Sequence, residues 1–135
     1  DGQLDLAVAN IDGNSVSDLM ATTPGSFAAA TSVKACSYPS TVSAGDFDLD
    51  GRQDLAVSCE LSSTVVLLVG FGDGVFFPGQ KEISKRGSGP LAIGDVNGNY
   101  GSDYMGCLFT TCRSQNHVTV DRSAGLSFPG YPSAA

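Results

Sequence analysis

The sequence has no tryptophan, a single histidine (His117) and only 7 Lys or Arg residues among 135. Zinc sites use several Cys or His side chains at short spacing, and no Cys-x-x-Cys occurs, so we expect no zinc. Fourteen acidic residues give a net charge of −7. Phosphate binding needs clustered basic side chains, so we expect no nucleic-acid partner.

Long apolar runs and catalytic motifs are also absent. No run of about 18 apolar residues occurs, so we expect no membrane insertion. The sequence contains neither a Gly-x-Ser-x-Gly elbow nor a complete dinucleotide-binding glycine pattern. Carboxylates are common, but a metal accounts for them better than glycoside hydrolysis does. The sequence therefore predicts a protein that is not an enzyme.

The acidic residues are biased in type. Twelve of the 14 are Asp, and only Glu60 and Glu82 are Glu. Asp favours turns and metal-binding loops, whereas Glu suits exposed helices. With 17 Gly, 6 Pro and 41% hydrophobic residues, the chain is too apolar for disorder and too rich in turn formers for a helical bundle.

The chain repeats itself with a period of about 49 residues. Gln3-Leu4-Asp5-Leu6-Ala7-Val8 returns as Arg52-Gln53-Asp54-Leu55-Ala56-Val57, and Asp54 returns as Asp103. Each unit is typical of short strands joined by turns. Those of the second unit are residues 54–59, 64–69, which is β-branched and too short for a helix, and 75–77, and residues 90–93 lead into the third unit. About three four-stranded repeats of this length predict an all-β fold of β-propeller blades, with units at about 1–45, 46–94 and 95–135.

Each unit opens with a loop of spaced carboxylates. The most complete copy is Asp46-Phe47-Asp48-Leu49-Asp50-Gly51-Arg52-Gln53-Asp54. Oxygen donors at alternate positions can converge on one centre where a Gly allows a sharp turn, and Ca²⁺ takes six to eight such oxygens. We expect the side chains of Asp46, Asp48, Asp50 and Asp54, with the carbonyl of Arg52, to bind Ca²⁺ in a structural role. A single Asp-Gly pair would instead indicate only a hairpin turn.

The other two copies of the loop are less complete. The third has the candidate ligands Asp95, Asn97, Asn99, Gly101 and Asp103. Its Asn residues lose charge, and Tyr100 replaces the turn glycine, so we expect a weaker site. The first copy retains only Asp1, Gln3 and Asp5 beside Gly2.

These loops, with Gly70-Phe71-Gly72-Asp73-Gly74, resemble the FG-GAP (or VCBS) repeat, the blade unit of integrin α-subunit-like β-propellers. The resemblance covers nearly the whole chain, with residues 46–93 matching throughout and 107–117 more loosely. It implies a six- to eight-bladed propeller with Ca²⁺ in loops on one face, and adhesion to, or binding of, a protein or glycan. An accessory region of a secreted carbohydrate-active enzyme and a purely architectural repeat are the alternatives.

The chain holds slightly under three such blades, whereas a propeller needs more to close its ring. We expect further blades to come from the same polypeptide, of which this chain is a piece, in preference to other copies of the chain.

Four cysteines suit two disulfides, for which three pairings exist. Cys36–Cys59 and Cys107–Cys112 are the favoured pairs. An even number of cysteines together with Ca²⁺ loops indicates an oxidising, calcium-rich space, so we expect the protein to be secreted or displayed at the cell surface.

Overall fold

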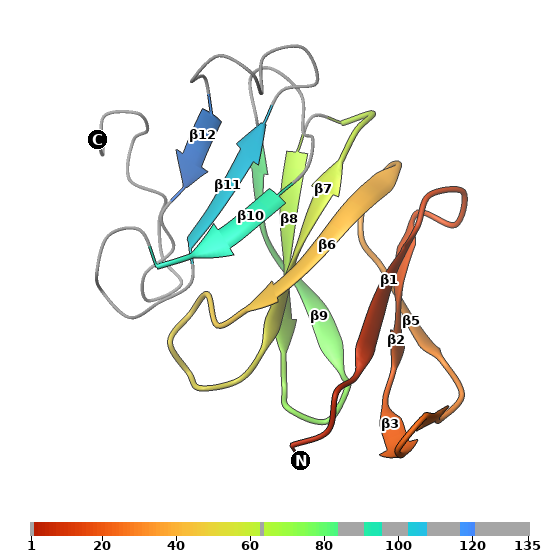
Figure 1. Cartoon of the computed structure of the whole chain (residues 1–135). Helices are drawn as coiled ribbons and strands as arrows, with labels where there is room; N and C mark the ends of the chain where they lie inside the picture. The colour runs from red at the N-terminus through yellow and green to blue at the C-terminus, as the bar shows by residue number, and fades with distance from the viewer. Residues whose placement is uncertain (1, 63, 84–90, 96–102, 108–116, 121–135) are drawn as a thin grey trace.

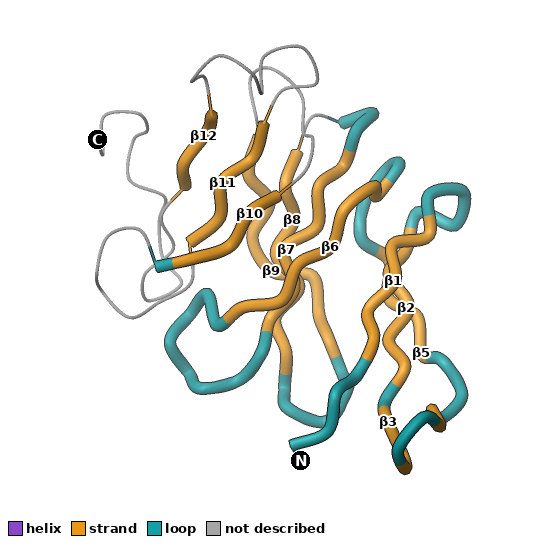
Figure 2. Tube along the Cα trace, viewed as in Figure 1, coloured by secondary structure: helices purple, strands orange, loops and turns teal. Residues whose placement is uncertain are grey.

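The computed structural model describes residues 2–62, 64–83, 91–95, 103–107 and 117–120. Every regular element within these residues is a β-strand (Figure 2), which confirms the all-β prediction. The strands are β1 (Leu6–Asn10), β2 (Ser15–Leu19), β3 (Ala21–Thr23), β4 (Ser26–Phe27), β5 (Thr31–Lys34), β6 (Pro39–Gly45), β7 (Asp54–Cys59), β8 (Thr64–Gly70), β9 (Phe76–Ile83), β10 (Leu91–Gly94), β11 (Asp103–Cys107) and β12 (His117–Val120). The described part of the chain contains no helix able to cross a bilayer.

The strands form three antiparallel sheets that follow one another along the chain. The first has the order β1-β2-β5, the second β6-β7-β8-β9 and the third β10-β11-β12, while β3 and β4 make a small separate hairpin. Figure 1 shows the second sheet lying between the other two. Short neighbouring strands joined by tight turns explain this order, because antiparallel strands need no long crossover.

The strands predicted in the second unit are present. Residues 54–59 coincide with β7, and residues 64–69 lie within β8, which ends one residue later. The predicted strand at 75–77 begins one residue before β9, which continues to Ile83. Residues 91–93 of the predicted segment 90–93 lie in β10, and residue 90 lies outside the described residues. β-branched residues such as Val65 and Val66 favour these extended segments.

The sequence repeat is also a repeat of strand pairing. In the first hairpin Leu6 pairs with Leu19 and Ala7 with Asp18. In the second, Leu55 pairs with Leu68 and Ala56 with Leu67, so every partner is shifted by the same 49 residues. The first and second units therefore place equivalent residues on equivalent faces of their sheets.

The core consists of two layers, one on each face of the second sheet. Leu55, Val57 and Leu68 pack with Val16 of β2 on the side of the first sheet. Phe47, Ala56, Val65 and Leu67 pack on the opposite side, where Leu91 and Ile93 of β10 cover them. Strand alternation sends successive residues to opposite faces, and with both faces covered β7 is buried along its whole length.

The Asp loop of the second unit connects two strands of a single sheet. It connects β6 to β7, which are neighbours in the second sheet, so that sheet begins one strand before the loop. The sequence units, by contrast, begin at the loop. Because paired strands hold both ends of the loop, the backbone positions from which its carboxylates extend are fixed.

Candidate metal centre

The loop between Gly45 and Asp54 turns through two residues with left-handed backbone conformations. Leu49 has φ 64° and Gly51 has φ 85°. Gly adopts this conformation at no steric cost, which is why the sequence requires it there. Gly2, 49 residues earlier, has φ 86°, so the first unit keeps a left-handed glycine at the equivalent position.

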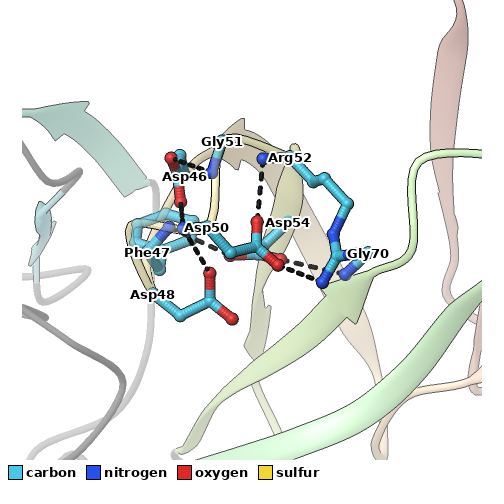
Figure 3. Close-up of polar contacts among 8 residues, drawn as sticks. All are labelled: Asp46, Phe47, Asp48, Asp50, Gly51, Arg52, Asp54 and Gly70. Carbon is cyan, nitrogen blue, oxygen red and sulfur yellow. Dashed lines mark hydrogen bonds and ion pairs between the residues drawn. The ribbon is translucent and has the colours of Figure 1, made fainter.

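Backbone amides inside the loop hold the carboxylates in place (Figure 3). Asp46 accepts hydrogen bonds from the N–H groups of Asp50 (3.2 Å) and Gly51 (2.9 Å). Asp48 accepts a second bond from the Asp50 N–H at 3.1 Å, and Asp50 accepts one from the Arg52 N–H at 2.8 Å. Such side-chain-to-backbone bonds are the usual way in which Asp stabilises a tight turn.

The turn brings three carboxylates together. One oxygen from each of Asp46, Asp48 and Asp50 lies within 4.8 Å of the others. Two oxygens that each lie 2.3–2.6 Å from a Ca²⁺ ion are separated by at most about 5 Å. The three side chains therefore fit the requirement for hard oxygen ligands around a single ion.

The electrostatics of the cluster differ between its members. Burial, together with the charges of Asp50 and Asp46, raises the pKa of Asp48. The N–H of Arg52 and then its guanidinium lower the pKa of Asp50. That guanidinium forms an ion pair with Asp50 and lies 5.4 Å from the centre of the Phe71 ring. A cation therefore already offsets part of the negative charge of the loop, on the side of Asp50.

Asp54, the fourth predicted side-chain ligand, has a different position. It is almost completely buried, and it is not among the three converging carboxylates. One oxygen accepts the Phe47 N–H at 2.9 Å and the other accepts the Gly70 N–H at 2.9 Å. Burial raises the pKa of Asp54 although both hydrogen bonds oppose that effect. In this structure the Asp54 side chain joins the loop to the end of β8.

The first unit has a contact equivalent to the one between Asp54 and Gly70, which we call the brace. An oxygen of Asp5 accepts the Ala21 N–H at 2.7 Å, and Ala21 follows Asp5 by 16 residues, as Gly70 follows Asp54. The two units differ in the residue that donates this hydrogen bond, which is Ala21 in the first and Gly70 in the second. A Cβ at Gly70 would meet the carbonyl oxygen of Gln53 at 1.9 Å, so only glycine fits the closely packed second unit.

The remaining predicted ligands are only partly within the described residues. Asp95 is exposed directly after β10, and Asp103 begins β11, just as Asp54 begins β7. Gln3 and Asp5 lie before β1. The other four predicted ligands, Asp1, Asn97, Asn99 and Gly101, fall outside the described residues.

The disulfide between Cys36 and Cys59 is present, as expected. Their Cα atoms are 5.9 Å apart, and Cys59 is the last residue of β7. The bridge ties the segment between the first and second sheets to the centre of the second. Cys107 is the last residue of β11, whereas Cys112 lies outside the described residues, so this pairing stays a prediction.

A further buried polar residue, Asp18, is not marked by any motif of the sequence. Asp18 lies on β2 with its side chain buried between the first and second sheets. The signal that could have found it is the repeat itself, because the residue 49 positions later is Leu67.

Comparison with known proteins supports the repeat assignment. Residues 1–57 match the family model of the FG-GAP-like repeat. No curated protein and no solved structure matches the chain. The matched residues include the first unit and continue through the Asp46 loop into β7. The chain therefore carries an FG-GAP-like repeat, a repeat typical of β-propeller-type modules, and residues 1–57 confirm the resemblance to this repeat seen in the sequence.

Proposed function

We propose that the chain is part of a Ca²⁺-stabilised β-propeller that acts outside the cell as a non-catalytic binding module. The observation that carries the proposal is the convergence of Asp46, Asp48 and Asp50 in a loop fixed at both ends by strands. Ca²⁺ would take these carboxylates as ligands and neutralise their mutual repulsion. Its role would be structural, holding the β6–β7 connection in its observed shape.

Two further observations favour an extracellular location and a larger propeller. The Cys36–Cys59 disulfide is of a kind that persists in oxidising compartments, where free Ca²⁺ is also abundant. The outward face of the first sheet exposes Leu6 and Val8, which are equivalent to the buried Leu55 and Val57. A further blade, from the same polypeptide or from another copy, would cover this face and extend the propeller. The ligand would be a protein or a glycan contacted by the loops.

Thermal unfolding with and without a chelator tests the calcium proposal. We expect Ca²⁺ at a hundredfold excess over its Kd to stabilise the protein by about 2.7 kcal/mol, which raises the Tm by roughly 5–15 °C. Asp48→Asn removes one ligand charge and should abolish most of this rise. Asp12→Asn, at an exposed turn outside the loop, is the matched control and should retain it. A Tm of the wild-type protein that excess chelator leaves unchanged would contradict the proposal.

The binding role is tested separately. The folded protein, immobilised in Ca²⁺, is screened against a glycan array and extracellular proteins, and each interaction is repeated in chelator. Saturable binding that disappears with the metal supports the proposal. A full set of negative results with a correctly folded, Ca²⁺-loaded protein would favour the purely architectural alternative.

A further inference from the structure

The first and second units differ most clearly at one buried position. Asp18 pairs with Ala7 in the first sheet as Leu67 pairs with Ala56 in the second. Leu67 is a core residue between the second and third sheets. Asp18 has the equivalent place between the first and second sheets, so a carboxylate occupies a position that the repeat elsewhere fills with an aliphatic side chain.

Asp18 is not satisfied there. Only 7% of the residue is exposed, and its Oδ2 atom has no hydrogen-bond partner among the described residues. The turn between β8 and β9 closes over this oxygen, because a Cβ on Gly74 would lie 2.9 Å from it. Burial of an ionised carboxylate without a partner is unfavourable, so its retention needs an explanation.

Asp18 is one of the residues that line a pocket of about 140 Å³. Thr31 of β5, the partner of Asp18, adds a hydroxyl group to its wall, while Val16, Val33 and Phe76 make the wall largely apolar. A metal ion would need several more oxygen ligands than the pocket offers. A single carboxylate surrounded by apolar side chains suits instead an organic cation with a hydrocarbon body.

We propose that this pocket binds an alkylammonium group. Its nitrogen would pair with the carboxylate of Asp18, and its carbon chain would lie against Val16, Val33 and Phe76. A cavity of this volume is similar to one that holds benzene, about 150 Å³, so a chain of roughly four carbons fits. Both a free amine and the lysine side chain of a bound protein carry such a group. The proposal does not depend on calcium in the Asp46 loop.

Titration of the ¹⁵N-labelled protein with n-butylammonium, followed by the amide resonances of Val33, Val75 and Phe76, tests the proposal. We expect saturable shifts at these residues, and butan-1-ol, which has the same chain without the charge, should bind at least about tenfold more weakly. Asp18→Asn should weaken n-butylammonium binding by about tenfold or more, because the charge-assisted hydrogen bond is lost. Asp12→Asn should bind like the wild-type protein.

A second probe, Nα-acetyl-lysine N-methylamide, distinguishes the two sources. If it shifts the same resonances, the pocket accepts a lysine side chain of a bound protein; if only n-butylammonium does so, the pocket takes a free amine. Thermal unfolding of Asp18→Asn establishes that the variant is folded. The proposal is overturned if Asp18→Asn binds n-butylammonium as tightly as the wild-type protein, if butan-1-ol binds equally well, or if no saturable shift occurs.

Discussion

The first and second sheets share a sequence pattern and a strand register but differ in what covers them. Leu6 and Val8 of β1 are 47% and 44% exposed, whereas their equivalents Leu55 and Val57 are 3% and 0% exposed. The hairpins pair identically, so the strands themselves do not cause this difference. The first sheet covers Leu55 and Val57, and no described residue covers Leu6 and Val8 to the same extent. The second unit thus depends on the first for the burial of its own leucine and valine.

Truncation of the two equivalent leucines should give the largest difference. Leu55→Ala leaves a cavity between two sheets and should cost about 2–5 kcal/mol of unfolding free energy. Leu6→Ala removes a side chain that is already half exposed and should cost less than about 1 kcal/mol. Chemical denaturation of both variants beside the wild-type protein measures the two losses.

Equal losses for these variants would contradict the comparison. They would mean that another sheet covers Leu6 in solution, and light scattering on the same samples would then detect an association of chains.

Asn substitution of the two bracing aspartates should give a smaller difference. Asp54→Asn leaves a single carbonyl oxygen for two backbone donors and turns its amide group toward one of them. One buried N–H then lacks an acceptor, which should cost about 1–3 kcal/mol. Asp5→Asn can keep its single bond to the Ala21 N–H, and its exposure should limit the cost to about 0.5 kcal/mol.

Denaturation of both Asn variants in excess chelator separates this brace from any contribution of bound metal. Equal costs at the two positions would show that the burial of Asp54 does not strengthen its contacts with the backbone.

The smallest expected effect has the opposite sign and concerns Asp18. Burial, followed by the charge of Asp5, raises the pKa of Asp18 above its ordinary value of 3.8. The folded protein therefore holds this proton more tightly than the unfolded protein does. Ionisation of Asp18 thus costs stability, and the cost grows as the pH rises through the folded pKa.

We accordingly expect Asp18→Asn to be modestly more stable than the wild-type protein at pH 7, in buffers without amines. Its advantage should vanish as the pH falls below the unfolded pKa of about 3.8, where Asp18 is protonated in both states. Melting curves of both proteins across this range provide the check. An advantage that is independent of pH would rule out the ionisation of Asp18 as its cause.

The strands and the metal loop could be predicted from the sequence because both depend on local patterns. The β-branched run at 64–69 specifies an extended segment, and Gly51 after three alternating Asp residues specifies a tight turn with converging oxygens. Of the three possible cysteine pairings, the sequence favoured Cys36–Cys59 because this pair ties the link before the second unit to a strand of that unit, and the structure contains it.

The roles of Asp54 and Asp18 depend on contacts that the spacing of residues does not encode. Asp54 fits the alternation of ligands in the loop, but the end of β8 returns to the loop and provides Gly70 as a second backbone donor. Asp18 appears as one polar residue in an alternating strand. Only the packing of the 71–75 turn against β2 makes it a buried carboxylate.

A crystal structure determined in the presence of Ca²⁺ tests the central claim most directly. We predict an ion within 2.3–2.6 Å of oxygens from Asp46, Asp48 and Asp50, and no ion in crystals of Asp48→Asn grown under the same conditions. The structure would also establish whether Asp54 keeps both hydrogen bonds to the backbone or turns toward the metal. A wild-type loop with the observed conformation and no bound ion at millimolar Ca²⁺ would contradict the account.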